Sequence, residues 1–251
     1  MLLIDIGNSR VKWTRVRNGE RATQRNEPLR GSGLALFRRL TKTLPEQVEI
    51  RVVNVAGKAV ETALRAATSA AGLHPPRLLR SVDRDASGLI NGYHEPWRLG
   101  ADRWAAMLGA RQLTGGVRAL CVVDAGTALT IDFVDAAGQH LGGYIVPGPA
   151  LAVHSLLSGT RGIRRRASGA RPAADRPWPR STLPAIEQGA LEACAGAIVR
   201  GHAAARRELG PSMKLLLTGG AAPALLPLLP PAVRHVPDLV LAGLQAWDNR
   251  R

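Results

Sequence analysis

Two stretches of this 251-residue chain repeat the same construction, and the repeat limits the folds that the chain can adopt. In the first, the apolar residues Leu2–Ile4 run into Asp5-Ile6-Gly7-Asn8-Ser9, and in the second, Leu120–Val123 run into Asp124-Ala125-Gly126-Thr127. Both read Asp-X-Gly-X-(Ser/Thr), and apolar residues alternate with polar ones after each turn, which predicts two strand-turn-strand hairpins. Because the two aspartates lie about half a chain apart, we expect a duplicated α/β architecture.

Strands and helices alternate along the rest of the sequence, which excludes an all-α or all-β fold. We expect further strands at Ile50–Val55 and Lys214–Leu217. Amphipathic or Ala/Leu-rich segments predict helices at Leu34–Leu44, Ala59–Ala71, Asp102–Leu113, Pro184–Leu209 and Asp238–Trp247. The chain should therefore form two domains, residues 1–115 and 116–251, each of which begins with one hairpin.

The charge balance is strongly basic, with 34 Lys and Arg against 19 Asp and Glu and a formal net charge of +15. Such an excess is typical of nucleic-acid binders, but here the charges are spread along the chain, as an arginine-rich compositional bias would also produce. The densest basic stretch, Arg161–Arg180, alternates Arg with Gly, Pro and Ala and lacks the aromatic interleaving of a base-stacking surface. We expect an exposed loop there, and we do not expect nucleic acid as a partner.

The two cysteines, Cys121 and Cys194, both lie among apolar residues and are interpreted as small buried side chains in a reducing compartment. No run of about 18 apolar residues is long enough to predict a membrane span. The first residues, Met1-Leu2-Leu3-Ile4-Asp5, lack the basic segment of a signal peptide. We therefore expect a cytoplasmic protein that does not contact a membrane.

An aspartate at the end of a strand, followed by a glycine turn, suits the binding of phosphate. The backbone N–H groups of such a turn can approach phosphate oxygens, a Ser or Thr hydroxyl adds a donor, and the carboxylate holds Mg²⁺ directly or through water. One such turn is more often an ordinary tight turn, but two copies, each directly after an apolar strand, favour a site for a triphosphate. A third glycine element, Thr218-Gly219-Gly220, also follows an apolar strand and is interpreted either as a nucleoside contact or as a plain strand-to-helix loop.

Gly100-Ala101-Asp102-Arg103 places an acid and a base at the start of a predicted helix. Aspartate in this position commonly caps a helix or complements its dipole. With Arg103 adjacent, the same pair also suits a carboxylate that accepts a proton beside a guanidinium that binds an anion. The six histidines are dispersed, and none has the spacing of a metal site or a catalytic triad.

Four motifs together carry a resemblance to a known family. They are Asp5-Ile6-Gly7-Asn8-Ser9-Arg10-Val11-Lys12, Gly100-Ala101-Asp102-Arg103, Asp124-Ala125-Gly126-Thr127-Ala128 with Thr130-Ile131-Asp132, and Gly142-Gly143-Tyr144-Ile145-Val146-Pro147-Gly148. In this order, from residue 1 to about residue 220, the chain resembles the type III pantothenate kinases of the actin, hexokinase and Hsp70 superfamily. The resemblance implies an α/β fold of two ribonuclease-H-like (actin-like) domains with a nucleotide cleft between them. It implies the first phosphate loop and the catalytic aspartate in the first domain, and the second phosphate loop and an adenosine loop in the second.

The resemblance also implies roles for individual residues. Asp102 is expected to be the general base that takes the proton from the primary hydroxyl of pantothenate. Substrate-binding positions are expected at Tyr93, Gly100, Ala101, Asp102, Arg103 and Thr182. ATP-binding positions are expected at Asp5, Ile6, Gly7, Asn8, Ser9, Arg10, Val11, Lys12 and Thr127. Without the resemblance, Tyr93 is equally well interpreted as a half-buried aromatic residue, and Thr182 as a helix N-cap.

The implied cofactors are ATP, Mg²⁺ near Asp5, and a monovalent cation, K⁺ or NH₄⁺, on Asp124. The implied partners are pantothenate and a second copy of the chain in a homodimer, and the implied reaction is the first step of coenzyme A synthesis. Two departures from the family pattern stand out: Ser9 replaces the usual Thr, and Thr160-Arg161-Gly162-Ile163-Arg164 replaces a Thr-Ala-X-Leu-Pro run. The alternatives are a kinase of the same fold for another small alcohol, and a regulatory accessory protein that binds nucleic acid.

Overall fold

The computed structural model describes residues 1–168 and 178–247. Their contacts divide the chain into two compact units. Unit 1 comprises Met1–Arg118, Val134–Leu141 and the described part of Asp238–Arg251, and unit 2 comprises Ala119–Phe133 and Gly142–Pro237. Each unit contains one mixed β-sheet with helices packed against it, which confirms the predicted fold class of two ribonuclease-H-like α/β units.

The sheet of unit 1 is built around the first predicted hairpin. Its strands run in the order β3-β2-β1-β5-β6, and β4 also pairs with β2. Strand β1 pairs antiparallel with β2 and parallel with β5. The strand bounds are β1 Leu2–Ile6, β2 Arg10–Arg17, β3 Glu20–Arg21, β4 Arg25–Pro28, β5 Ile50–Asn54 and β6 Arg77–Leu78.

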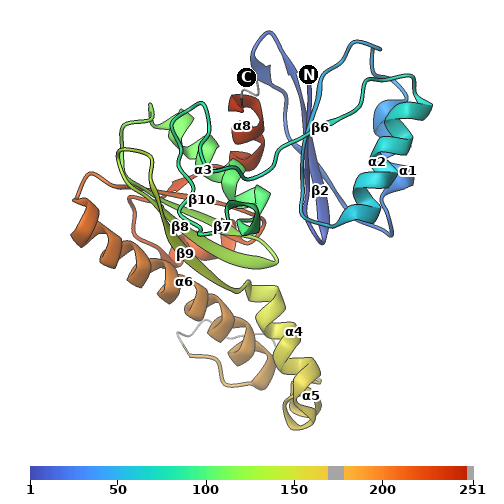
Figure 1. The fold of residues 1–251 in the computed structure, drawn as a ribbon. Coiled ribbons are helices and arrows are strands. Elements are labelled where there is room, and N and C mark those ends of the chain that lie inside the picture. Colours follow the sequence, from blue (N-terminus) through green and yellow to red (C-terminus); the bar gives the residue numbers. More distant parts are fainter. Residues whose placement is uncertain (169–177, 248–251) are drawn as a thin grey trace. The chain divides into compact units, whose positions relative to one another are not determined.

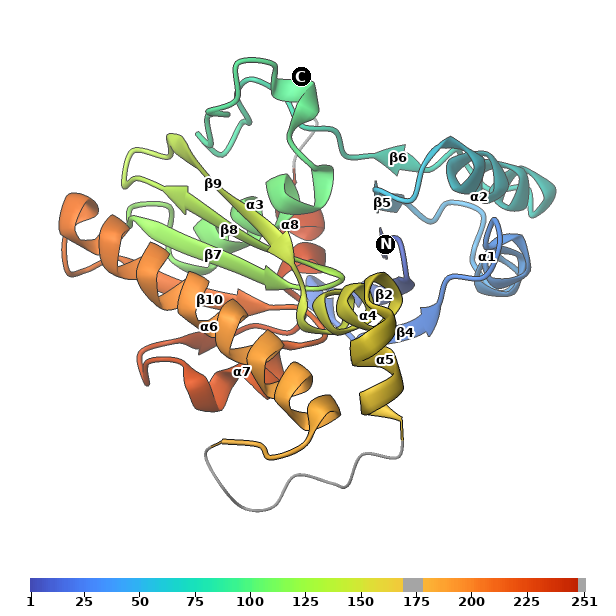
Figure 2. The same cartoon turned by 90° about the horizontal axis from the view of Figure 1, so that it is seen from below.

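Two pairs of helices cover this sheet. Helices α1 and α2 lie side by side in Figures 1 and 2 and bury apolar residues of β1, β2 and β5. Helices α3 and α8 pack tightly on each other and contact β1 and β5. The helix bounds are α1 Leu34–Thr41, α2 Lys58–Ala70, η1 Pro96–Arg98 (a 3₁₀ turn), α3 Ala101–Leu113 and α8 Leu239–Ala246.

The second sheet repeats the arrangement of the first. Its strands run in the order β11-β10-β7-β8-β9, so β7 lies between its hairpin partner β8 and the parallel strand β10, as β1 lies between β2 and β5. Only two residues separate β7 from β8, a connection that antiparallel neighbours allow. The strand bounds are β7 Leu120–Ala125, β8 Ala128–Val134, β9 His140–Pro147, β10 Lys214–Thr218 and β11 Arg234–His235.

The long helix α6 runs beside the second sheet (Figure 2) and buries Ala195 and Ile198 in the same apolar core as β7 and β10. Helices α4 and α5 pack against α6 and against each other. The helix bounds are α4 Pro149–Gly159, α5 Arg161–Ala167, α6 Thr182–Leu209, α7 Ala222–Leu225 and η2 Leu226–Leu228.

All five predicted helices and both further strands are present, and each observed boundary lies within three residues of the prediction. One expectation is wrong: Arg161–Ala167 forms helix α5, although we expected an exposed loop over Arg161–Arg180. Arginine and alanine are good helix formers, and the three arginines of the last turn, Arg164–Arg166, complement the negative end of the helix dipole. Residues 169–177 of the expected loop lie outside the described residues.

Within the described ranges, the protein contains no helix that is both long and apolar enough to cross a membrane.

Candidate active site

The first glycine turn joins β1 to β2 and sets a buried carboxylate beside a lysine. Asp5 is 6% exposed and stands directly opposite Lys12 in the antiparallel register. The Nζ of Lys12 lies 3.8 Å from Oδ2 of Asp5. Because the two side chains leave the same face of the hairpin, they present a cation and an anion together beside the turn.

The side chains of the turn are exposed to solvent, and a backbone hydrogen bond joins its two ends. The N–H of Gly7 donates to the carbonyl oxygen of Arg10 at 3.0 Å, and Asn8, Ser9 and Arg10 are exposed. The guanidinium of Arg10 donates to Oδ1 of Asn26 on β4, with Nε at 2.9 Å. The predicted ATP-binding residues Asp5–Lys12 therefore form a single hairpin turn with its flanking strand ends, and the polar side chain of Arg10 is held in place by Asn26.

The second cluster stands at the N-terminus of α3. Asp102 lies in the first turn of the helix, and its Oδ1 accepts the backbone N–H of Arg103 at 2.8 Å. A Cβ atom on Gly100 would lie 2.5 Å from that same oxygen. Glycine at position 100 therefore leaves the space that the Asp102 carboxylate occupies.

Arg103 contacts the Asp102 carboxylate through its backbone N–H and Tyr93 through its side chain. Arg103 is 5% exposed, and its Nη1 donates to the hydroxyl oxygen of Tyr93 at 2.7 Å, with the guanidinium 5.5 Å from the centre of the tyrosine ring. The Tyr93 ring in turn stacks on His140, with centroids 5.9 Å apart and planes 15° from parallel. The structure thus brings Tyr93, Gly100, Asp102 and Arg103 together at the start of α3.

Two residues without a sequence signal of their own role support this cluster. His140 is 1% exposed and backs the Tyr93 ring, although the six histidines carried no signal of their own. Asn91 accepts the N–H of Tyr93 on its Oδ1 at 3.0 Å and donates from Nδ2 to the Pro96 carbonyl at 3.1 Å. The Asn-Gly-Tyr sequence at 91–93 is a recognisable turn signal that could have indicated this loop.

Helix α3 is fixed by an unusually close crossing with α8. A Cβ atom on Gly243 would lie 1.8 Å from the carbonyl oxygen of Ala105, and one on Gly109 would lie 2.4 Å from the carbonyl oxygen of Leu239. Only hydrogen at these two positions lets the helix backbones meet, and residues Arg103–Arg111 of α3 are all buried. The direction in which Asp102 points therefore depends on α8 as well as on α3.

The second glycine turn and the third glycine element meet in unit 2. Asp124 on β7 is paired with Thr218 on the parallel strand β10. Both residues therefore lie at the carboxyl ends of neighbouring strands. A Cβ atom on Gly219 would lie 2.4 Å from Oδ1 of Asp124, and Gly219 has a φ of +97°, which favours glycine. Thr127, in the turn after Asp124, is exposed, and its carbonyl oxygen accepts the N–H of Gly148 at 3.0 Å.

The remaining predicted substrate residue, Thr182, belongs to unit 2 and is the first residue of α6. The N-cap position of that helix is Ser181, so the alternative interpretation of Thr182 as an N-cap is wrong. The carbonyl oxygen of Ser181 accepts the N–H of Ala185 at 3.0 Å, which starts the helix.

The donor groups of the two turns suit hard cations. Mg²⁺ is commonly bound by one or two carboxylates together with phosphate oxygens, and Asp5 and Asp124 supply one carboxylate on each turn. No group of three His, Cys, Asp or Glu side chains converges anywhere in the described parts of the chain. The residues present therefore fit cations that arrive with a phosphorylated ligand better than a metal centre built from protein side chains alone.

Comparison with known proteins identifies the family of this chain. Residues 1–204 match the family model described as type III pantothenate kinase. The type III pantothenate kinase of Azoarcus sp. (strain BH72) is 39% identical over 97% of this chain and 89% of the relative. That of Nitrosococcus oceani is 36% identical over 97% of this chain and 92% of the relative.

Among solved structures, a Campylobacter jejuni protein described as a Baf family transcriptional activator aligns with a TM-score of 0.57. It is 22% identical, and the alignment covers 98% of this chain and 96% of that chain, so it shows a shared fold. The family model and the two full-length relatives are more specific than this fold likeness, because they share sequence as well as topology. This chain belongs to the type III pantothenate kinase family.

Proposed function

We propose that this protein transfers the γ-phosphoryl group of ATP to the primary hydroxyl of pantothenate. The products are ADP and 4'-phosphopantothenate, and the reaction is the first step of coenzyme A synthesis. The observation that carries the proposal is the contact of Asp102, Arg103 and Tyr93 at the start of α3, in a chain whose relatives are named type III pantothenate kinases.

Arg103 is the residue best suited to hold the substrate's carboxylate. Pantothenate is an anion, and a guanidinium matches the two oxygens of a carboxylate better than an ammonium does. The 2.7 Å hydrogen bond to Tyr93 fixes one nitrogen of Arg103 and so restricts how the guanidinium can rotate. We also assign Gly100, Ala101 and Thr182 to the binding of pantothenate, as the family resemblance implies.

Asp102 is the proposed general base. The hydroxyl oxygen of pantothenate attacks the γ-phosphorus, the bond to the bridging oxygen of ADP breaks, and the hydroxyl proton passes to the Asp102 carboxylate. In a loose phosphoryl-transfer transition state the proton leaves late, so the alignment of the alcohol matters as much as the basicity of the carboxylate. The hydrogen bond from the Arg103 N–H to Oδ1 orients the carboxylate for this role.

The phosphates of ATP are assigned to Asp5–Lys12 in unit 1 and to Thr127 in unit 2. Lys12 supplies a positive charge, and the turn after Asp5 supplies backbone donors. Asp5 would hold Mg²⁺, directly or through water, and Asp124 would hold K⁺ or NH₄⁺. When bound, these cations offset the negative charge of the phosphates.

The direct test measures phosphorylation of pantothenate by ATP in KCl and in NaCl. Asp102→Asn should lower kcat by about 100-fold or more, because general-base catalysis contributes about that much, while ATP still binds. Glu95→Gln is a matched control that removes an exposed carboxylate. Among the described residues its ion pair is with Arg98, and the change should leave kcat unchanged.

Full activity of Asp102→Asn would remove Asp102 from the reaction. ATP binding without phosphorylation of pantothenate, and with turnover of another small alcohol, would move the assignment to a different acceptor. Salt-sensitive binding of DNA that persists in Asp102→Asn, with no turnover of any alcohol, would favour the regulatory alternative. Equal rates in KCl and NaCl would contradict the assignment of a monovalent cation to Asp124.

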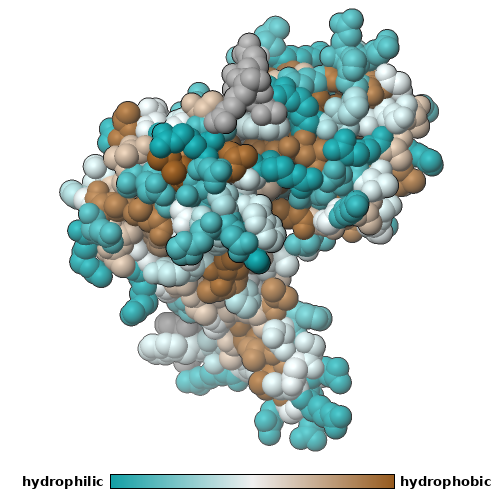
Figure 3. Space-filling view, in the orientation of Figure 1, coloured by the Kyte–Doolittle hydropathy of each residue, from teal (hydrophilic) through white to brown (hydrophobic). Residues whose placement is uncertain are grey.

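We also propose that the protein forms a homodimer through unit 2. Apolar side chains are exposed along β9 and α4, among them Tyr144 (50%), Ile145 (61%) and Leu156 (42%). Figure 3 shows apolar surface over α4, whereas the arginine-rich α5 is hydrophilic. A groove of about 420 Å³ lies between Tyr144 and the small residues of α6 around Gly201. Exposed apolar surface of this kind is typical of an interface.

The dimer proposal is tested by the molar mass in solution. Ile145→Asp should convert a dimer to a monomer in analytical ultracentrifugation, because burying an unpaired carboxylate is costly. Val117→Asp, at a residue that is 73% exposed in unit 1, is the matched control and should leave the mass unchanged. A wild-type protein that sediments as a monomer would contradict the proposal.

The protein is assigned to the cytoplasm. Cys121 and Cys194 are both free and buried, which suits a reducing compartment. Cell fractionation with an antibody to the chain would test the assignment.

A further inference from the structure

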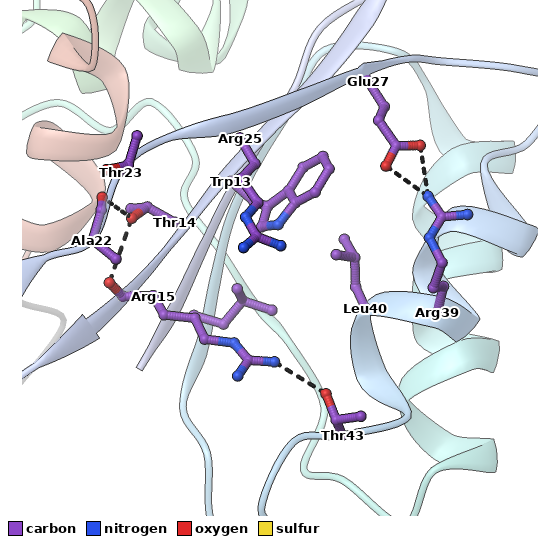
Figure 4. A pocket seen from close by; sticks show the side chains of 11 residues that line it. Trp13, Thr14, Arg15, Ala22, Thr23, Arg25, Glu27, Arg39, Leu40 and Thr43 are labelled. Carbon is purple, nitrogen blue, oxygen red and sulfur yellow. Dashed lines mark hydrogen bonds and ion pairs between the residues drawn. The ribbon is translucent and has the colours of Figure 1, made fainter.

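A pocket of about 360 Å³ lies in unit 1 between β2, the strand β4 and the C-terminal end of α1 (Figure 4). None of the residues assigned to ATP or pantothenate lines this pocket. Its volume lies at the lower end of the range for pockets that bind small molecules. The residues that line it are Leu2, Trp13, Thr14, Arg15, Ala22, Thr23, Arg25, Glu27, Arg39, Leu40 and Thr43.

The pocket lies on the opposite face of the sheet from the predicted phosphate loop. In the register of the first hairpin, Asp5 pairs with Lys12 and Ile4 pairs with Trp13. Successive residues of a strand point to opposite faces, so Trp13 points away from the side on which Asp5 and Lys12 meet. A ligand in this pocket would therefore not occupy the place assigned to the phosphates of ATP.

The inner wall of the pocket is apolar and contains one large ring. Trp13 is 8% exposed and belongs to the buried core of unit 1, together with Leu2. Leu40 of α1 points into the same space in Figure 4. An indole flanked by leucines is a surface against which a flat apolar group packs well.

The rim of the pocket is positively charged. Three arginines line it, Arg15, Arg25 and Arg39, against one carboxylate, Glu27. Glu27 is already engaged, because Nη2 of Arg39 lies 2.7 Å from its Oε1 and 2.6 Å from its Oε2. Two positive charges at the rim are left without a carboxylate from the pocket.

These two charges, Arg15 and Arg25, lie close to the indole. Arg25 pairs directly with Trp13 across β2 and β4, so the two side chains share one face. No hydrogen bond or ion pair joins the guanidinium of Arg25 to another described residue, whereas the guanidinium of Arg15 donates from Nη2 to Oγ1 of Thr43 at 3.1 Å. Figure 4 shows both guanidinium groups directed into the space between the strands and α1.

We propose that this pocket binds a small organic anion that carries a flat ring. The ring packs against Trp13 and Leu40, and the carboxylate or phosphate group of the ligand takes hydrogen bonds from Arg25 and Arg15. The apolar wall alone would accept any flat molecule, and the two arginines restrict the choice to anions.

The test uses 2-naphthoate as the probe and uncharged 2-naphthamide as its matched control. Saturation-transfer NMR and isothermal titration calorimetry on the full-length protein should show naphthoate bound with a stoichiometry of one per chain. The affinity for naphthamide should be lower by about tenfold or more, because naphthamide lacks the negative charge. Arg25→Gln and Arg15→Gln should each weaken naphthoate binding by about threefold to tenfold, as loss of a partly exposed charge contact does.

Arg38→Gln is the matched control variant, because it removes an exposed arginine of α1 that does not line the pocket. It should leave naphthoate binding unchanged, and saturating ATP or pantothenate should not displace the probe. No binding of naphthoate, equal binding of naphthamide, displacement by ATP or pantothenate, or identical affinities in Arg25→Gln, Arg15→Gln and Arg38→Gln would each overturn the proposal. Naphthoate can fail to bind while pantothenate is still phosphorylated, so this proposal and the proposed function fail separately.

Discussion

The hydroxyl oxygen of Tyr93 accepts a 2.7 Å hydrogen bond from Nη1 of Arg103, which joins the loop before η1 to the first turn of α3. The bond spans ten residues of sequence and fixes the Nη1 end of the guanidinium. It therefore makes the orientation of Arg103 depend on a residue outside the helix.

Tyr93→Phe tests this dependence. The variant keeps the ring and its stacking on His140 but removes the hydroxyl, so Arg103 loses one fixed contact. We expect the KM for pantothenate to rise roughly tenfold, which corresponds to the loss of about one hydrogen bond, with a smaller change in kcat. Steady-state kinetics measure both values, and an unchanged KM would show that Tyr93 does not orient Arg103 for the substrate.

Gly243→Ala tests the crossing of α3 and α8. The added methyl would collide with the carbonyl oxygen of Ala105, so the helices must separate. We expect a loss of about 1–3 kcal/mol in the free energy of unfolding, as overpacking of a core costs, and a lower kcat because Asp102 moves with α3. Urea denaturation followed by circular dichroism measures the stability.

Gly189→Ala is the matched control for that substitution. Gly189 lies inside α6, and a Cβ atom there would meet nothing within 4 Å. The same change should therefore stabilise the protein by about 0.5–1 kcal/mol, because alanine is the better helix former. Equal effects of the two substitutions would show that the contact between α3 and α8 is not what constrains Gly243.

Glu49 gives a prediction for the pH dependence of stability. The hydrogen bond from Arg51, with the positive charges of Arg51 and Arg77, holds the pKa of Glu49 below its ordinary value of 4.5. A carboxyl whose pKa is lower in the folded state stabilises the fold above its unfolded pKa. That contribution is lost as the pH falls through the folded pKa.

Glu49→Gln should therefore destabilise the protein at pH 7 but have less effect at pH 3. The loss at pH 7 should be below about 1 kcal/mol, since the carboxylate is partly exposed to solvent. Thermal denaturation of both proteins at the two pH values measures the difference. A larger destabilisation at pH 3 than at pH 7 would reverse the predicted sign.

The two thiols should be inert in the folded protein. Burial raises the pKa of Cys121, the negative charge of Asp132 raises it further, and burial also raises the pKa of Cys194. Because the thiolate is the reactive form, neither residue should react with 5,5'-dithiobis(2-nitrobenzoic acid) at pH 8. Both should react after unfolding in urea. Rapid reaction of one thiol in the native protein would mean that the helix or strand that carries it opens locally.

The sequence predicted the parts of the site that depend on local structure. Asp5 and Asp124 each follow a short apolar strand and precede a glycine turn, and these features are set by residues within one hairpin. Asp102 and Arg103 are adjacent at a helix start, so their proximity is certain once the helix forms. The repeated hairpin also predicted the duplicated sheet, because a strand and its nearest neighbour in sequence usually pair.

Contacts between segments that are far apart in the chain could not be predicted from local sequence patterns. The stacking of Tyr93 on His140 and the crossing of Gly243 with Ala105 depend on tertiary packing that no local pattern encodes. Helix α5 was missed for a different reason, since Gly162 and the later prolines favoured a loop while the arginines supplied enough helix propensity for seven residues.

The position of α8 in unit 1 has a consequence for the order of folding during synthesis. Helix α3 and the loop of Tyr93 emerge from the ribosome early, whereas α8, which packs on α3, is translated only after the whole of unit 2. Domains generally begin to fold as they emerge. Unit 2 can therefore be complete before the packing around Asp102 is, and the nascent chain must protect one face of α3 from aggregation until Leu239–Ala246 has been made.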